Sequence, residues 1–274
     1  GFIGTNLIKK LLNDGHDVIS VDNYSTGKKE NEQAGCDYHD IDLSNDKWWE
    51  FSDSVSGYTS TLIKQVDIIF HLAAIARIQP SFEHPSYTFS SNTTATLNVL
   101  EWARHHKTPV IYAGSSSSHG DKFSNPYTLS KHQGEQLIEL YSKVYDLPTS
   151  ICRFYNVYGA YQLTEGDYCT LIGIYERLQK EGKTLTVTGD GEQRRDFTHV
   201  EDIVDGLVKC GNALYNDVLV GNISGQTFEL GRGKNYSVNE IVKAFGETDV
   251  EYLAKRPGEM RETLNTDTKA RDVL

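Results

Sequence analysis

The chain has 274 residues, which suffices for one large domain or two modest ones, and it contains no apolar run that approaches the roughly 20 residues of a membrane-spanning helix. Its formal charge of −11 argues against a nucleic-acid or anionic-membrane partner, which would need a basic face, although a local arginine pocket can still bind a small anion. Its four cysteines have no Cys-x-x-Cys spacing, so we expect reduced thiols in a cytoplasmic protein and no metal site.

The first 22 residues have the pattern of the second half of a βαβ unit. Gly1-Phe2-Ile3-Gly4 leads into a helical pattern over residues 5–13, and an apolar strand over residues 18–21 ends at Asp22. In a complete unit the glycine-rich turn admits a pyrophosphate at the helix N-terminus, and the acid about 20 residues later binds the adenosine ribose. An acid there favours NAD over NADP, because it repels the 2′-phosphate. The first strand of the unit is expected to be missing from this chain.

Strands and helices then alternate as far as residue 155, which is typical of a parallel doubly wound sheet. The expected strands cover residues 36–39, 66–74, 110–113 and 148–154, and the expected helices lie within 81–106 and over 127–145. Trp48-Trp49 is interpreted as a local core cluster, and residues 52–60 are interpreted as an exposed loop. The pattern predicts an α/β, Rossmann-type domain over residues 1–155.

Ser115 and the segment 125–131 carry the pattern of an acid–base site. Tyr127 and Lys131 are four residues apart, so they share one face of a helix. A cation beside a phenol favours the phenolate, which makes Tyr127 a candidate general base. Ser115 follows the strand over residues 110–113, at the sheet edge where ligands bind, and its hydroxyl can reach the same substrate oxygen. A helix-face pair without chemistry is the alternative.

The alternation loosens after Tyr155. The expected helices lie near residues 170–181, 201–214 and 237–246, and the expected strands lie near 185–188 and 218–223. We therefore expect residues 156–274 to form mainly a smaller α/β lobe that binds the substrate and interleaves with the first domain.

These segments resemble the extended short-chain dehydrogenase/reductase family, and within it the NAD-dependent epimerases and dehydratases similar to UDP-glucose 4-epimerase. The resemblance runs through the whole chain in the family's order. It is carried by Gly1-Phe2-Ile3-Gly4, Asp22-Asn23, Asp40-Ile41, His71-Leu72-Ala73-Ala74, residues 112–120, 125–135, 153–159 and 189–202, and Arg256-Pro257-Gly258-Glu259. Tyr24 and Lys28 share the Tyr-x-x-x-Lys spacing but lack these surroundings, so that pair is attributed to chance.

The resemblance implies a role for each segment. The implied NAD-binding residues are Gly1, Phe2, Ile3, Gly4, Asp22, Asn23, Asp40, Ile41, Leu72, Ala73, Ala74, Tyr127, Lys131 and Phe154. The implied catalytic residues are Ser115, Tyr127 and Lys131, with Ser116 or Ser117 in place of Ser115 if the register slips. The implied substrate-binding residues are Ser116, Asn156, Arg195, Arg256 and Glu259, with the arginines at the UDP diphosphate.

The implied activity is epimerisation of a UDP-hexose through a transient 4-keto sugar, by a homodimer in which Lys131 lowers the pKa of Tyr127. A 4,6-dehydratase is disfavoured because Ser115-Ser116-Ser117 lacks the acid that eliminates water. A UDP-glucuronate epimerase or decarboxylase stays open, since it needs one more cation near C6 and Arg77 is a candidate. A non-catalytic NAD-binding protein also stays open, although such proteins often lose the Tyr or the Lys.

Three positions depart from the family pattern or bear on the sugar. His119 stands where the family usually has Tyr, and Gly114 stands where a Ser is usual. Both changes are expected to reshape the sugar pocket without removing the chemistry. Thr263 aligns with a gate residue of the family, and its modest side chain would leave room for an N-acetyl group.

Overall fold

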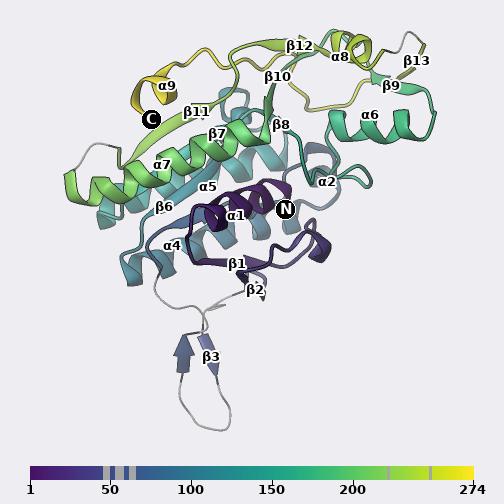
Figure 1. The fold of residues 1–274 in the computed structure, drawn as a ribbon. Coiled ribbons are helices and arrows are strands. Elements are labelled where there is room, and N and C mark those ends of the chain that lie inside the picture. Colours follow the sequence, from purple (N-terminus) through teal and green to yellow (C-terminus); the bar gives the residue numbers. More distant parts are fainter. Residues whose placement is uncertain (46–49, 53–58, 62–65, 221–222, 247–248) are drawn as a thin grey trace.

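The computed structural model describes residues 1–274 except 46–49, 53–58, 62–65, 221–222 and 247–248 (Figure 1). A four-stranded parallel sheet lies at its centre, in the order β11-β7-β6-β5. These strands are Gln226–Leu230, Thr149–Phe154, Val110–Ser115 and Ile69–His71, respectively. A separate parallel pair is formed by β1 (Val18–Asp22) and β2 (Cys36–Asp40). The chain therefore has an α/β fold with parallel sheets, as the sequence predicts.

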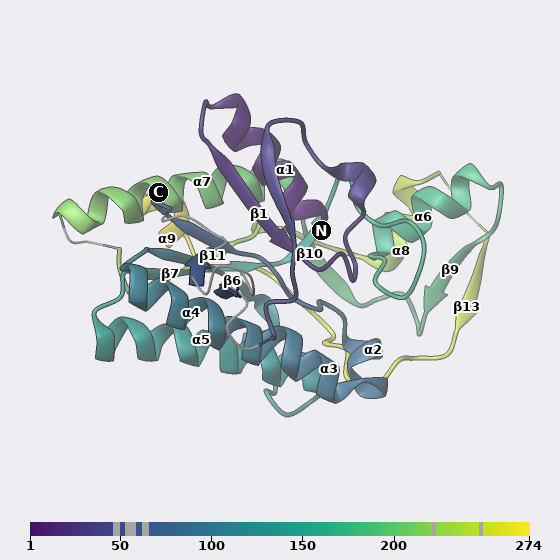
Figure 2. The ribbon, with the colours of Figure 1, turned by 90° about the horizontal axis from the view of Figure 1, so that it is seen from below.

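Helices cover both faces of the central sheet. On one face lie α4 (Ala95–His106) and α5 (Pro126–Tyr145), and on the other lie α1 (Phe2–Asn13) and α7 (Val200–Val220) (Figure 2). Successive side chains of a strand point to opposite faces of the sheet, and β6 is buried along its whole length because both faces are covered. Tyr112 packs with Trp102 and Ile138 on the α4/α5 side, whereas Ile111 packs with Leu207 of α7.

The start of α5 is fixed by its own sequence. The Asn125 side chain caps the helix by accepting the backbone N–H of Thr128 at 2.8 Å, and Pro126 occupies the first helical position, where no N–H is needed. The helix ends at Asp146, whose φ of 51° is left-handed. The cap lies two residues before Tyr127, so it sets where that side chain leaves the helix.

The segment before α4 is more broken than the sequence predicts. Residues 78–94 form α2 (Ile78–Glu83), α3 (Pro85–Phe89) and a π-helical turn (Ser90–Thr94). At this turn the Asn92 side chain accepts the backbone N–H of Ile75 at 2.7 Å and donates to Ser130 Oγ at 2.9 Å. Asn92 thus ties the segment after β5 to the helix that carries Tyr127.

A smaller group of elements lies beside the sheet (Figure 1). One mixed sheet has the order β12-β10-β8, and a parallel pair joins β9 to β13. The strands are β8 (Asn156–Tyr158), β9 (Leu185–Thr188), β10 (Arg194–His199), β12 (Asn235–Ser237) and β13 (Val250–Leu253), and the helices are α6 (Leu171–Lys180) and α8 (Val238–Ala244). The last helix, α9 (Lys269–Val273), lies beside β11 of the central sheet instead. Tyr175, Leu185 and Val242 belong to the core of this group.

Several predicted boundaries are wrong. The strand expected near 218–223 is wrong for residues 218–220, because α7 continues to Val220 and its buried stripe of Ile203, Leu207 and Leu214 keeps helical spacing. Residues 221–222 lie outside the described residues. The strand is β11, which follows Gly225 at a φ of 75°. The strand expected over 66–74 shortens to β5.

The predicted loop over 52–60 is corrected at both ends, since β3 (Glu50–Ser52) pairs with β4 (Thr59–Thr61). Trp48, Trp49 and residues 53–58 lie outside the described residues. Short 3₁₀ turns cover Lys29–Asn31 and Ser116–His119. Among the described helices, none is both long and apolar enough to cross a membrane.

Gly134 on α5 gives a stability test of the packing that positions the site. A Cβ added there would lie 2.1 Å from the hydroxyl oxygen of the fully buried Tyr112. Helix propensity alone predicts that Gly134→Ala stabilises by about 1 kcal/mol, whereas overpacking costs roughly 1–3 kcal/mol. We expect overpacking to dominate, so urea denaturation should give a lower free energy of unfolding. Gln136→Ala, at an exposed position of the same helix, is the control and should have little effect. A stabilised Gly134→Ala variant would contradict the packing described.

Candidate active site

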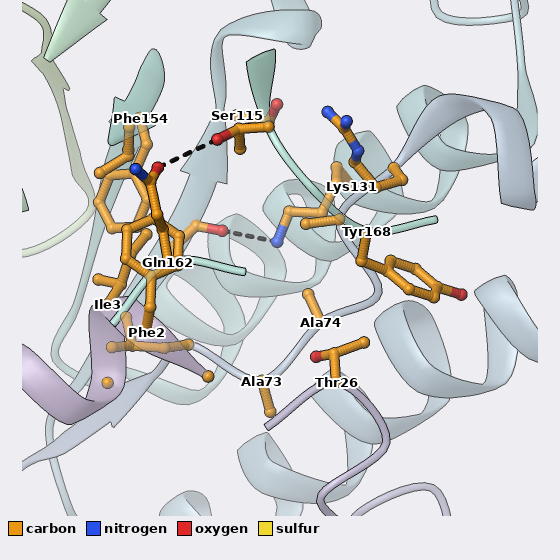
Figure 3. Close-up of a pocket in the computed structure, with 18 of the residues that line it drawn as sticks. Phe2, Ile3, Thr26, Ala73, Ala74, Ser115, Lys131, Phe154, Gln162 and Tyr168 are labelled. Carbon is orange, nitrogen blue, oxygen red and sulfur yellow. Dashed lines mark hydrogen bonds between the residues drawn. The ribbon is translucent and has the colours of Figure 1, made fainter. Parts of the chain in front are cut away.

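A cavity of about 1570 Å³ runs from the first turn of α1 to the loop around Glu259. It contacts the carboxyl ends of β1, β5 and β6, where open parallel sheets bind their ligands. Figure 3 shows Phe2, Ile3 and Phe154 gathered on one side and Tyr168 on the other, with Ser115 and Lys131 between them. Its lining residues run from Gly1 to Thr263, so both halves of the chain contribute to the cavity.

The three predicted catalytic residues meet in this cavity. Ser115 Oγ and Tyr127 Oη lie 3.2 Å apart, within hydrogen-bond distance, and Ser117 Oγ lies 2.9 Å from Ser115 Oγ. Lys131 donates to the backbone carbonyl of Ala113 at 2.6 Å (Figure 3), and its Nζ lies 4.2 Å from the centre of the Tyr112 ring. A hydroxyl placed beside Tyr127 would therefore meet a phenol, a serine and a nearby ammonium.

The groups that shift the pKa of Tyr127 are not those that the sequence predicts. Desolvation raises the pKa of Tyr127, whereas the hydrogen bond with Ser115 and the charge of Arg77 oppose this rise and Glu135 adds to it. The predicted lowering of this pKa by Lys131 is not observed, because the Lys131 ammonium is directed to the Ala113 carbonyl. Burial lowers the pKa of Lys131 itself to about 8, against a smaller opposing influence of Glu135.

A buried ionic network supports the strand that carries Ser115. Arg153 on β7 donates to Glu135 on α5, with its shortest contact at 2.8 Å, and to Glu229 on β11 at 3.0 Å. Glu135 also accepts the backbone N–H of Ser115 at 3.3 Å. His119, the departure from the family's Tyr, lies 3.0 Å from Glu229. The network joins the ends of three adjacent strands to α5, the helix that carries Tyr127 and Lys131.

Gly114 has a steric reason to lack a side chain. A Cβ there would lie 2.7 Å from Ile151 Cγ2, 2.8 Å from Arg153 Cγ and 2.8 Å from Glu135 Oε1. Contacts this short would push the Arg153–Glu135 pair apart. The second departure from the family pattern therefore leaves room for the ionic network rather than for the sugar.

The end of the cavity at α1 has the features of a dinucleotide site. The Asp22 carboxylate accepts the backbone N–H of Tyr24 at 2.8 Å and lines the cavity near Gly1 and Gly4. A Cβ on Gly4 would meet no atom within 4 Å, so a phosphate can approach the backbone there. Leu72, Ala73, Ala74 and Phe154 line the same cavity. The open glycine turn, the acid and the small residues at the end of β5 fit NAD.

Three predicted cofactor residues lie outside the cavity lining. The Asp40 carboxylate pairs with Lys29 at 2.7 Å. The backbone N–H of Ile41 donates to the Asp22 carbonyl at 3.2 Å, and Asn23 accepts the backbone N–H of Ser25 at 3.1 Å. These residues shape the loop after Asp22.

The opposite end of the cavity collects the predicted substrate residues. Ser116, Asn156, Arg195, Arg256 and Glu259 all line it. Burial lowers the pKa of Arg195, whose guanidinium lies 3.9 Å from the Glu259 carboxylate. Thr263, the expected gate residue, also lines the cavity and donates to the Asn156 side chain at 3.2 Å.

Sequence reasoning missed one wall of the cavity. It is contributed by the loop between β8 and α6, which brings Gln162, Leu163, Tyr168, Cys169 and Thr170 to the lining. The loop carries no hydrophobic period and no repeated spacing, so only its position after Asn156 could have marked it.

Comparison with known proteins identifies the family of the chain. Residues 1–221 match the NAD dependent epimerase/dehydratase family. The chain is 30% identical over 296 residues to a UDP-glucose 4-epimerase of Mycolicibacterium smegmatis, covering 100% of this chain and 90% of that protein. It is also 28% identical to a UDP-N-acetyl-alpha-D-glucosaminuronate decarboxylase of Bacillus cytotoxicus, covering 89% and 76% of the two chains.

Among solved structures, the UDP-glucose 4-epimerase of Thermotoga maritima with UDP-glucose superposes with a TM-score of 0.85 at 24% identity, covering 99% of this chain and 89% of that one. The chain belongs to the NAD-dependent epimerase/dehydratase family, and the resemblance predicted from the sequence is confirmed.

The depressed pKa of Lys131 predicts a pH dependence of stability. The unfolded lysine titrates near its usual pKa of about 10.4, so between pH 8 and that value the unfolded state binds more protons and stability rises with pH. Between pH 8 and 9.5 the unfolding free energy of the native protein should rise by roughly 1.5 kcal/mol relative to Lys131→Met. Urea denaturation of both proteins across this interval measures the difference. Parallel pH profiles would show that Lys131 keeps an ordinary pKa.

Proposed function

We propose that the protein is an NAD-dependent nucleotide-sugar 4-epimerase that acts on a UDP-sugar of the hexose class. One observation carries the proposal: Ser115 Oγ and Tyr127 Oη lie 3.2 Å apart in a cavity that also contacts the dinucleotide features at α1 and the arginines of the smaller lobe. The candidate general base thus lies in one cavity with the proposed cofactor-binding residues and the proposed anion-binding residues. Both the family and the fold support this choice.

The residues that would hold NAD lie along α1, β1 and β5. The backbone around Gly1 and Gly4 would receive the pyrophosphate, Asp22 the adenosine ribose, and Lys131 the nicotinamide ribose. When bound, NAD supplies the acceptor and the donor of a hydride. The protein supplies position, charge and the base.

Tyr127 is the proposed base for the sugar 4-hydroxyl. Ser115 accepts or donates a hydrogen bond at the same oxygen and orients it toward the phenolate. Proton removal and hydride loss at C4 give a 4-keto sugar, which turns within the cavity and is reduced from its other face. Tyr127 then returns the proton to the new hydroxyl.

The nucleotide would be held by the smaller lobe. Arg195 and Arg256 present guanidinium groups suited to the diphosphate of UDP, and Glu259 can accept the ribose hydroxyls. Such an anchor, remote from C4, lets the sugar turn without leaving the site. We accordingly propose residues 1–155 as the NAD-binding domain and residues 156–274 mainly as the nucleotide-sugar lobe.

A dehydratase is less well supported by this site. Elimination of water from the sugar needs an acid close to the base, and the positions after Ser115 are Ser116 and Ser117. Glu135, which lies behind this turn, already accepts hydrogen bonds from Arg153, Ser115 and Ser118. Its carboxylate is therefore committed to the network.

We also propose that two copies pair through α4 and α5. Apolar side chains on these helices are exposed, among them Leu97, Leu140, Val144 and Tyr145. The molar mass in solution measures this pairing.

Replacement of Tyr127 by Phe should abolish epimerisation. Loss of the phenol removes the base, and general acid–base catalysis is worth about 10²- to 10⁴-fold in rate. The NAD-loaded protein would be tested with UDP-glucose, UDP-N-acetylglucosamine and UDP-glucuronate. Proton NMR should show a new anomeric signal, and mass spectrometry should show that the mass of the nucleotide sugar is unchanged. Tyr127→Phe should retain NAD and give no such signal.

Tyr252→Phe, at an exposed position of β13 outside the cavity lining, is the matched control and should keep full turnover. Loss of NAD from the Tyr127→Phe protein would instead make Tyr127 structural. Loss of water from the sugar would identify a dehydratase, and firm NAD binding without turnover of UDP-, GDP-, CDP- or dTDP-sugars would favour a non-catalytic protein.

A further inference from the structure

Arg77 is a cation in the cavity that makes no direct contact with a carboxylate of the described residues. It directly precedes α2, is partly buried and lines the same space as Tyr127. Within the part of the chain that the structure describes, its guanidinium makes no hydrogen bond and no ion pair. By contrast, Arg153 is held by two carboxylates and Arg195 by backbone carbonyls. A guanidinium removed from water without an anion is costly, so this one is suited to a charged ligand.

Contacts of α2 place Arg77 at the sugar end of the cavity. Ser81, one turn after Arg77, accepts the backbone N–H of Tyr127 at 3.2 Å. On its other side, Gln79 donates to the Pro257 carbonyl at 3.0 Å, next to Arg256. The helix that follows Arg77 is therefore fastened both to the catalytic helix and to the late loop.

The charges around Arg77 agree with this placement. Burial lowers the pKa of Arg77 and the nearby Arg256 lowers it further, whereas Glu259, Cys169 and Tyr127 raise it. Glu259 acts on Arg195 as well, together with Arg261. Because α2 contacts both Tyr127 and Pro257, Arg77 lines the cavity beside the base and the late loop. A sugar whose C4 is at Tyr127 and whose diphosphate is at the late loop would lie beside Arg77.

This inference rests on the proposed function, because that function sets which end of the substrate reaches Tyr127. C4 has two ring neighbours, C3 and C5, and the substituent on C5 is the neighbouring group that can be a carboxylate. A planar guanidinium binds a carboxylate through two parallel hydrogen bonds. We propose that Arg77 binds a carboxylate on C5 of the sugar, so that the substrate is a nucleoside-diphosphate hexuronate rather than a neutral hexose.

Affinity and turnover measured on an acidic and a neutral sugar test this assignment. The NAD-loaded protein and its Arg77→Gln and Arg77→Lys variants would be compared on UDP-glucuronate and UDP-glucose, by titration calorimetry and by NMR. The native protein should prefer the acid in both Kd and kcat/KM. A charged hydrogen-bonded pair predicts that Arg77→Gln lowers this preference on the order of 10- to 100-fold, mainly through KM. Arg77→Lys keeps the charge without the fork and should be intermediate.

Arg256→Gln is the matched control, because it removes a cation from the same cavity at the diphosphate. It should weaken UDP and both sugars alike and leave the preference unchanged. Three results would overturn the assignment: a native preference for the neutral sugar, an equal loss on both sugars in Arg77→Gln, or weaker binding of UDP alone in that variant. An equal loss with a shifted pH profile would mean that Arg77 serves the Tyr127 phenolate.

Failure of the proposed function gives a different result. Release of carbon dioxide and a UDP-pentose, with the same dependence on Arg77, would support the carboxylate site while replacing epimerisation by decarboxylation. Binding that favours the acid without any turnover would likewise support the site and contradict the epimerase. Absence of binding by either sugar would contradict both.

Discussion

The site depends on one buried carboxylate. Glu135 is only 2% exposed, and it accepts hydrogen bonds from the guanidinium of Arg153 and from the backbone N–H of Ser115. It therefore fixes the end of β6 against the helix that presents Tyr127, so the distance between the serine and the phenol follows from the network. Removal of one partner of such a pair leaves an unpaired buried charge, which is strongly destabilising. Gly114 is part of the same constraint, because any side chain there would enter the network.

Electrostatics around the base are not those of an isolated Tyr–Lys pair. Lys131 is buried between the Ala113 carbonyl and the Tyr112 ring, where its ammonium is partly satisfied and its pKa falls to about 8. Arg77 is the cation whose charge favours the phenolate of Tyr127, and Glu135 opposes it. Two cations, Lys131 and Arg77, therefore lie in the same cavity as Tyr127. In the function proposed above, Lys131 binds the cofactor ribose and Arg77 binds the sugar.

Local sequence predicted the elements that hold the site but not all of its contacts. Local signals predicted the strand β6 from its buried apolar run and the helix α5 that follows Asn125. The four-residue spacing of Tyr127 and Lys131 predicted that they share one face of this helix. The Arg153–Glu135–Glu229 network joins positions up to 94 residues apart, and no spacing encodes that meeting. The same holds for the direction of the Lys131 ammonium and for the loop around Tyr168. The strand expected near residue 220 failed because an apolar run of that length also continues a helix.

In the proposed function, Tyr127 and Ser115 would remove and return the proton of the sugar 4-hydroxyl, and NAD, when bound, would supply the hydride acceptor and donor for C4. The most direct measurement uses a UDP-sugar with deuterium at C4, incubated with the NAD-loaded protein in ordinary water and followed by NMR. Direct transfer of hydride from C4 and back predicts that both epimers keep the label at C4. Loss of the label to water, or inversion at C5 with exchange there, would contradict the account.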